Sequence, residues 1–468
     1  MTAGAGLPRA DVRTVRCVAG AAAALGLAVL AHPPRVLAQS CALPSSPGDF
    51  VQHVVVIVLE DRSFDHLVGW FTGTQSQTYR VSDPQSSQLC STFPLNRPND
   101  PDCSLGFSRN GTLLTVPTAT GTDDSDPDHG LSQLARYYDN GQADGWLFSL
   151  DGDLLNTSHY SIGYYEEDAQ MLPYLTRLLR DGNSITLSNY FASMLAQTRP
   201  NRIYEHAATT DRVDNFGCQF DCPPGQATIW DLDLGGLGTA FPAPGHQGRY
   251  YYGGSSVSDP IDYLNTFWPD RNYMTHPVEE FVDDLNAGIF APVTFIDSQH
   301  YHPPEDVSFA DLWLQQTVES IRQSPFWSST VIVITFDDGG GFFDHVVPPK
   351  VPSVTYADVI AGQQGGIGPD ANGLVPLGFR VPAIIVSPFG PSSGGTGFQY
   401  DHTSVLKMIE WAFLNNWRIP PGTHRDATDD GYIANLACAL DFTRASGSIE
   451  FPAFAASAAT NRAALHRR

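Results

Sequence analysis

The residues of this sequence most able to do chemistry are two pairs of adjacent acidic residues, each directly after a run of valine and isoleucine. The pairs are Glu60 with Asp61, and Asp337 with Asp338. Continuous Val/Ile runs are typical of strands buried on both faces of a parallel sheet, and ligands bind beyond the carboxyl ends of such strands. If the two strands are neighbours, four carboxylates meet and raise one another's pKa unless a counter-charge is present. Such oxygen ligands favour calcium, magnesium or manganese, so the pairs predict a divalent metal site. The alternative is two independent solvated turns.

A candidate nucleophile, Thr198, opens the segment Thr-Arg-Pro-Asn-Arg at residues 198–202. This hydroxyl precedes a proline at the predicted start of a helix that continues through residues 203–208. Backbone N–H groups and the helix dipole favour an anion at such a position. A metal that lowered the pKa of the hydroxyl would make the threonine a nucleophile. The alternative is a threonine that only caps the helix.

Four histidines lie close to these segments in the sequence: His129, His302, His345 and His402. A loop histidine can donate a hydrogen bond to a phosphoryl oxygen or protonate a leaving group. Taken singly, each is more often a structural hydrogen-bonding residue.

Strand-like and helix-like segments alternate along the chain, which predicts an α/β fold with a mostly parallel central sheet flanked by helices. The predicted strands cover residues 54–59, 293–296, 331–336 and 381–386, and the predicted helices cover residues 167–182, 203–208, 307–323 and 404–413. Two stretches rich in loop-forming residues, about 73–128 and 213–290, interrupt this order. We therefore expect one large domain, residues 39–468, with two long loop insertions.

The first 38 residues have the pattern of a secretory signal peptide. Three arginines precede an apolar stretch at residues 18–31, and a small-residue cleavage site follows at Val36-Leu37-Ala38. The apolar stretch is short for a membrane span, so cleavage near Ala38 is expected, with an uncleaved anchor as the alternative. No other apolar run approaches spanning length, which predicts a secreted or extracytoplasmic protein without stable membrane insertion.

Charge and cysteine content agree with export. The chain has 50 acidic and 26 basic residues and a formal charge of −24, which argues against binding to nucleic acid or to anionic membranes. Without Cys17, which lies in the predicted signal peptide, six cysteines remain, and an even number in an exported chain suggests disulfides. Pairing of near neighbours predicts the disulfides Cys90–Cys103 and Cys218–Cys222, which leaves Cys41 to pair with Cys438. A cysteine-rich metal site is the alternative, but the spacings lack a paired CxxC arrangement.

These segments together resemble the phosphoesterase family that includes non-specific phospholipase C and a group of acid phosphatases. The family's E-N-R-S-F-D-H motif is matched at residues 60–66, with Asp61 in place of asparagine. Its T-x-P-N-R and D-[DE]-x-G-G-F-[YF]-D-H-V motifs are matched at residues 198–202 and 337–346. An R-V-P…S-P element at residues 380–388 and a [DE]-H-T-S element at 401–404 follow in the same order.

The resemblance implies an alkaline-phosphatase-like α/β sandwich that hydrolyses phosphate esters with a divalent metal ion. Its metal ligands would be Glu60, Asp61, Asp337, Asp338 and Thr198. In that family the threonine becomes phosphorylated, and histidines at the positions of His129 and His302 hold the phosphate or protonate the leaving group. The implied substrate is a phosphate ester such as a phospholipid, cleaved as by phospholipase C.

Three positions depart from the family pattern. Asp61 adds a negative charge to the metal site, which should tighten metal binding but weaken the activation of phosphate. Gly339 and Glu305 stand where relatives carry histidine, so the acid that protonates the leaving group stays open. Two alternatives to phospholipase C-like cleavage therefore remain: an acid phosphatase that acts on monoesters, and a non-catalytic secreted binding protein on the same fold.

Overall fold

The structure, a computed structural model, describes sixteen parts of the chain: residues 41–69, 106–109, 112–115, 126–141, 172–180, 184–210, 212–215, 228–230, 248–253, 275–298, 302–344, 346–352, 356–392, 398–414, 416 and 432–443. Several predictions lie outside these residues: the signal peptide, His345, and the disulfides Cys90–Cys103 and Cys218–Cys222. Residues 36–468 group into one unit by their internal contacts, and the description below concerns that unit. The predicted domain boundary at residue 38 stays a prediction.

A seven-stranded sheet lies at the centre of this unit, with the strand order β4-β12-β9-β1-β8-β6-β7. Its strands are β1 (His53–Leu59), β4 (Ser184–Thr186), β6 (Arg249–Tyr252), β7 (Thr275–Pro277), β8 (Val293–Asp297), β9 (Thr330–Phe336) and β12 (Ala383–Val386). Strand β12 runs antiparallel to both of its neighbours, β4 and β9, and the other strand pairs of this sheet are parallel. The predicted α/β fold with a mostly parallel sheet is confirmed.

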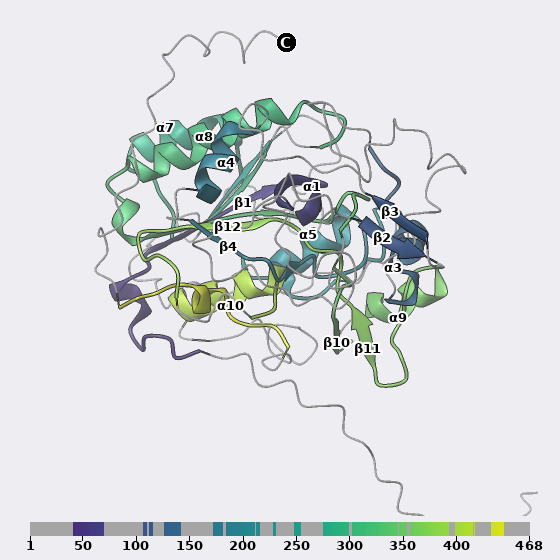
Figure 1. The fold of residues 1–468 in the computed structure, drawn as a ribbon. Coiled ribbons are helices and arrows are strands. Elements are labelled where there is room, and N and C mark those ends of the chain that lie inside the picture. Colours follow the sequence, from purple (N-terminus) through teal and green to yellow (C-terminus); the bar gives the residue numbers. More distant parts are fainter. Residues whose placement is uncertain are drawn as a thin grey trace, which may run out of the picture. The chain divides into compact units, whose positions relative to one another are not determined.

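Helices cover both faces of the sheet, as Figure 1 shows. Helices α4, α7 and α8 lie on one face, and α5 and α10 lie on the other. The α-helices are α1 (Phe64–Val68), α3 (Leu131–Tyr138), α4 (Pro173–Arg180), α5 (Thr198–Ala207), α7 (Phe281–Asn286), α8 (Val307–Arg322), α9 (Tyr356–Gln363) and α10 (His402–Phe413). Short 3₁₀ helices are η1 (Pro47–Asp49), η2 (Asp139–Gly141), η7 (Val278–Glu280), η8 (Trp327–Ser329) and η10 (Leu436–Ala439). None of the described helices combines the length and the apolar character of a membrane span.

The two-sided cover explains the composition of the central strands. Every residue of β9 is buried, and so is every residue of β1 except His53. Because both faces of these strands pack against helices, alternation of polar and apolar residues is absent and β-branched residues fill the sequence. This burial makes β1 and β9 a rigid base for the loops that follow them.

The two predicted loop insertions contain regular structure that the sequence did not reveal. Strands β6 and β7 and helix α7 lie within residues 213–290, and a hairpin of β2 (Gly106–Arg109) and β3 (Thr112–Thr115) lies within residues 73–128. Strand β6 has only four residues, too few for a clear periodicity, and its parallel pairing with β8 stabilises it. Tyr250 and Tyr251 of β6 are buried, so these two aromatics pack into the core.

Further short strand pairs and a disulfide add to the described structure. Strand β5 (Tyr190–Phe191) pairs with β13 (Tyr400–Asp401), and β10 (Lys350–Pro352) pairs with β11 (Leu374–Pro376). Cys41 and Cys438 form a disulfide, in agreement with the predicted pairing, and it joins the segment before β1 to η10.

Candidate metal centre and active site

Strands β1 and β9 bring their acidic ends to the same level of the sheet. The strands pair in parallel, and Leu59 and Phe336 are the last partners. The next residues, Glu60 and Asp337, leave the sheet side by side, and the backbone N–H of Asp337 donates to the carbonyl oxygen of Leu59 at 3.1 Å. This register is the reason that both acidic pairs meet at one edge.

Three of the four predicted carboxylates converge there. Asp61, Asp337 and Asp338 are buried, and each offers an oxygen within 4.8 Å of the others. Oδ1 of Asp61, and Oδ2 of Asp337 and of Asp338, accept no hydrogen bond from the described residues, whereas Oδ2 of Asp61 lies 3.0 Å from Nε2 of His302. Buried anions without hydrogen bonds are costly unless they are paired or coordinate a metal. A set of closely spaced oxygens in this state fits a hard divalent cation.

The fourth carboxylate, Glu60, lies beside this trio. Glu60, together with Asp61 and His302, forms a second possible metal-binding group. One ligand atom from each of the three residues lies within 4.8 Å of the others. The Glu60 side chain is 22% exposed, and its Oε1 lies 3.4 Å from Nη2 of Arg202. Asp61 therefore belongs to both groups, and Glu60 could complete the coordination of an ion from the more open side.

The crowding of negative charge raises the pKa of several of these carboxyl groups. Burial and the charge of Asp337 raise the pKa of Glu60 to about 8. Burial raises the pKa of Asp337 to about 6 and that of Asp338 well above its ordinary value. Burial acts in the same direction on Asp61, but two nearby histidines outweigh it, and its pKa is lowered. The edge therefore favours a counter-charge, which a divalent cation would supply.

A tight contact between two loops positions Asp61 beside Asp337 and Asp338. Asp61 has φ 57°, in the left-handed region, and its N–H donates to Oδ1 of Asp337 at 3.2 Å. Gly340, also at φ 57°, lies so close that a Cβ would be 2.3 Å from the carbonyl oxygen of Asp61. At Gly341 a Cβ would lie 2.9 Å from the side chain of Pro127, in the loop before His129. The two glycines let three loops meet around the acidic edge.

A buried group of three charged residues, Arg380 with Asp65 and Asp344, holds the same loops together. Arg380 is 1% exposed, and its guanidinium lies 2.9 Å from a carboxylate oxygen of Asp65 and 2.9 Å from one of Asp344. The hydroxyl of Ser63 donates to the carbonyl oxygen of Phe343 at 2.6 Å. The residues of both sequence motifs that follow the acidic pairs therefore hold the loop after β1 against the loop after β9.

Thr198 is the first residue of α5, and its side chain is 9% exposed. Gln197 occupies the N-cap position, so Thr198 is not the capping residue. The side chain of Asn201 holds the turn before the helix. Its Oδ1 accepts from the N–H of Met194 at 2.9 Å, and its Nδ2 donates to the carbonyl oxygen of Ala196 at 2.9 Å. The motif residues after Thr198 therefore build the turn that presents it.

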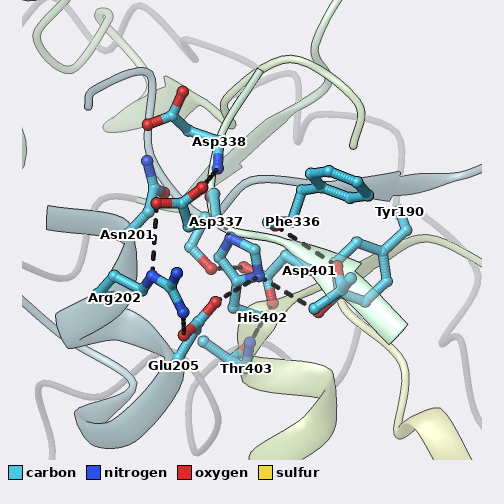
Figure 2. A network of polar contacts seen from close by, with 12 residues as sticks. Tyr190, Asn201, Arg202, Glu205, Phe336, Asp337, Asp338, Asp401, His402 and Thr403 are labelled. Carbon is cyan, nitrogen blue, oxygen red and sulfur yellow. Dashed lines mark hydrogen bonds and ion pairs between the residues drawn. The ribbon is translucent and has the colours of Figure 1, made fainter. Parts of the chain in front are cut away.

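Arg202 connects this helix to the acidic edge. It follows Thr198 by one helical turn, so the two side chains share a face of α5. The guanidinium lies 2.9 Å from Oδ1 of Asp297 and 3.4 Å from Oδ2 of Asp337. Figure 2 shows Arg202 between Glu205 and Asp337. The face of α5 that carries Thr198 is thereby held toward the ends of the strands.

Two of the predicted histidines contact Asp61. Nε2 of His302 lies 3.0 Å from Oδ2 of Asp61, and this contact raises the pKa of His302 to about 10. Nδ1 of His129 donates to the carbonyl oxygen of Pro127 at 2.8 Å, which leaves Nε2 3.9 Å from Oδ1 of Asp61. Burial alone would lower the pKa of His129, but Asp61 and Asp338 outweigh burial and raise it to about 9. Contact with these carboxylates therefore favours the cationic form of both histidines, and a cation on Asp61 would oppose both increases.

His402 has a different position from the other two histidines. It is fully buried at the start of α10, where Nε2 donates to the backbone carbonyl oxygen of Asp337 at 2.7 Å. The hydroxyl of Tyr190 donates to its Nδ1 at 3.3 Å. Figure 2 shows His402 close to Asp337, so it supports the backbone of the acidic edge from the side of α10.

Three residues of the site were missed from the sequence: Asp297, Arg202 and Glu205. Asp297 ends the apolar run of β8 much as Glu60 follows that of β1, so the same signal was present. Arg202 stood in a recognised motif, but its sequence neighbours do not show that it bonds to three strand ends. Glu205 is one helical turn from Arg202, and burial raises its pKa well above the ordinary value although Arg202 opposes the increase.

Comparison with known proteins agrees with this site. The sequence profile of the Phosphoesterase family matches residues 51–414, which span all the strands and loops of the site. The chain belongs to the phosphoesterase family. It is accordingly a hydrolase that acts on phosphoric ester bonds, and the alternative of a non-catalytic binding protein is set aside.

Several relatives of known name are phospholipases. Phospholipase C A of Mycobacterium tuberculosis (strain H37Rv) is 26% identical over 474 residues, which cover 93% of this chain and 86% of the relative. Non-specific phospholipase C1 of Arabidopsis thaliana is 26% identical, and the match covers 78% of this chain and 67% of the relative. A solved structure of a protein in the alkaline phosphatase superfamily from Vibrio parahaemolyticus matches 86% of this chain and 77% of its own, with 11% identity and a TM-score of 0.36.

Proposed function

We propose that this phosphoesterase is a secreted, metal-dependent enzyme that cleaves phospholipids in the manner of phospholipase C through a phosphothreonine intermediate. The observation that carries the proposal is the trio Asp61, Asp337 and Asp338, whose closely spaced carboxylates each keep a buried oxygen that accepts no hydrogen bond from the described residues, beside the helix that begins at Thr198. The names of the relatives support a phospholipid substrate. The N-terminal pattern of the sequence supports export.

The trio, with Glu60 beside it, would hold a calcium, magnesium or manganese ion. When bound, such an ion lowers the pKa of a nearby hydroxyl and offsets the charge of the phosphoryl group. Thr198 is placed to use this chemistry because it starts α5, where the positive end of the helix dipole also favours the phosphoryl oxygens. His129 and His302, which contact Asp61, would add imidazole donors for the phosphoryl group and the leaving group.

The reaction would follow two balanced steps. The hydroxyl oxygen of Thr198 forms a bond to phosphorus, its proton passes to solvent water, and the bond between phosphorus and the leaving oxygen breaks. His302, which is 48% exposed, donates a proton to the departing alcohol or, for a phospholipid, to the diacylglycerol oxygen. Water then attacks the phosphothreonine, releases the phosphate product and restores the hydroxyl. His129 would hold the phosphoryl group through both steps.

Turnover of two substrates tests the reaction. Phosphatidylcholine vesicles and 4-nitrophenyl phosphate are assayed with and without a chelator. Cleavage of the phospholipid, lost with the chelator and restored by a divalent cation, is expected. Preference for the aryl phosphate would instead favour the acid phosphatase alternative, and full activity in chelator would contradict metal dependence.

Substitution of Thr198 tests the nucleophile. Thr198→Ala should lower kcat by roughly 10³-fold or more, because the covalent route is lost, and Thr198→Ser should retain part of it. Acid quenching with a ³²P-labelled phosphomonoester should trap label on the wild type and not on Thr198→Ala. Thr317→Ala, which changes a buried threonine of α8, is the matched control. Unchanged turnover or labelling of Thr198→Ala would refute the assignment.

A further inference from the structure

The side chain of Arg202 contacts carboxylates from four different elements. It is 2% exposed, and its guanidinium lies 2.9 Å from Asp297, 3.4 Å from Asp337, 3.4 Å from Glu60 and 3.6 Å from Glu205. The first three carboxylates end or directly follow β8, β9 and β1, which are neighbours in the sheet, and the fourth lies on α5 itself. Arg202 therefore joins the nucleophile's helix to three strands of the sheet.

The shape of the guanidinium matters for these contacts. Arginine presents five donors in one rigid plane, whereas lysine places a single point charge at the end of a flexible chain. Three different nitrogens of Arg202 reach carboxylates: Nη1 reaches Asp297, Nη2 reaches Glu60, and Nε reaches Asp337. One side chain therefore fixes the relative positions of three strand ends.

The hydrogen bonds of Asp297 set it apart in role from the carboxylates of the candidate metal site. Asp297 accepts hydrogen bonds from Arg202 at 2.9 Å and from the hydroxyl of Tyr250. It is not among the described carboxylates that group as metal ligands. The acidic end of β8 is thus committed to Arg202, while the acidic ends of β1 and β9 keep oxygens that accept no hydrogen bond from the described residues.

We propose that Arg202 is a positioning residue for the phosphoryl transfer. It holds the first turn of α5, and with it Thr198, at a fixed distance from Asp61 and Asp338. Its contribution is geometric and depends on the fork of the guanidinium as well as on its charge. This inference rests on the proposed function, because it presumes that Thr198 reacts beside a cation held by the trio.

Two variants separate position from charge. Arg202→Lys keeps the charge but loses the fork. The double variant Arg202→Gln/Asp297→Asn removes one positive and one negative charge together, so the net charge of the site is unchanged and no carboxylate at residue 297 is left without its partner. Arg322→Lys is the matched control, since Arg322 pairs with Glu319 on α8 outside the site.

The measurements are kcat and KM for the better substrate, the dissociation constant for Mn²⁺ by calorimetry, and the folded fraction by circular dichroism. Arg202→Lys and the double variant should each lower kcat by roughly 100-fold per folded molecule, the loss expected when a reacting group is misplaced by about 1 Å. KM and the dissociation constant for Mn²⁺ should change by only a few-fold, because neither the trio nor the substrate contacts are removed. Arg322→Lys should match the wild type.

Other outcomes overturn the inference. A kcat of Arg202→Lys near that of the wild type would mean that charge alone suffices. A loss of activity that only follows the loss of folded protein would mean that Arg202 serves stability and not positioning. If the wild type itself neither binds Mn²⁺ nor turns over substrate, the proposed function fails first, and that result is distinct from both.

Discussion

Replacing Gly340 with alanine tests whether the contact between the loops after β1 and β9 sets the geometry of the acidic trio. Gly340 has φ 57°, and a residue with a Cβ in this left-handed region loses about 1–2 kcal/mol. In addition, the new Cβ would lie 2.3 Å from the carbonyl oxygen of Asp61, and real contacts essentially never fall below 3.0 Å. The two loops must therefore move apart by about 0.7 Å or more, because the near atom belongs to the backbone.

A displacement of this size exceeds the roughly 0.5 Å within which a functional site keeps its geometry. Asp61 would move relative to Asp338, so the affinity for a divalent cation should fall by roughly 10-fold or more. kcat should fall by roughly 100-fold. The free energy of unfolding should fall by more than the roughly 1–2 kcal/mol that left-handed strain alone explains.

Gly373→Ala is the matched control, because Gly373 has φ 74° and no atom lies within 4 Å of the position that a Cβ would take there. Its free energy of unfolding should fall by about 1–2 kcal/mol, and its activity should be unchanged. Urea unfolding, Mn²⁺ titration and turnover per folded molecule measure the three effects for both variants. If Gly340→Ala binds Mn²⁺ and turns over substrate as well as Gly373→Ala does, the loop contact does not set the site geometry and this reasoning is wrong.

Three further predictions concern buried ionisable groups: Asp61, His206 and Arg380. Asp61→Asn should weaken divalent cation binding by roughly 10-fold or more. Contact with Asp61 raises the pKa of His302 to about 10, so the substitution should lower this pKa toward its ordinary value. An NMR titration measures the pKa, and an unchanged value would contradict the assignment. Burial lowers the pKa of His206 to about 3, so only the unfolded chain takes up this proton between pH 6.5 and 3, and stability is lost as pH falls through that window. Between about pH 7.5 and 5, the free energy of unfolding of His206→Leu should therefore fall by about 2 kcal/mol less than that of the wild type. Denaturant titrations measure both, and equal decreases would refute the assignment. Arg380→Met leaves the buried carboxylate of Asp344 without its ion pair and should lower the free energy of unfolding by roughly 3–5 kcal/mol, measured by urea unfolding; a loss below about 1 kcal/mol would argue against this group of charged residues.

The sequence predicted the sheet well because of the way β1 and β9 are built. Both strands are buried on both faces, so their Val/Ile runs stand out, and both end abruptly in acids. It could not predict β6, whose four residues gain their strand conformation from pairing with β8 and not from any pattern of their own. Local pattern thus identified the strands at the centre of the sheet and missed those toward its edge.

The site was predictable to the extent that chemistry follows residue type. Carboxylates at strand ends pointed to a cation, and Asp61, Asp337 and Asp338 do converge. The position of Asp61 in the trio depends on its own backbone turn, which enters the left-handed region. Such a turn is set by the approach of Gly340 from a loop far later in the chain, which no local pattern contains.

The proposed function divides the three acidic strand ends between a fixed and an exchangeable counter-charge. Arg202 is a fixed cation that pairs with Asp297 and also touches Asp337, and it arrives with the helix that carries Thr198. Asp61 and Asp338, farther along the two loops, keep oxygens without hydrogen bonds among the described residues. A second fixed cation in their place would satisfy the charge but would leave no ligand position open to substrate, whereas a divalent ion accepts further oxygens. The arginine can therefore fix the geometry of the edge while the chemistry is left to an ion bound by Asp61 and Asp338.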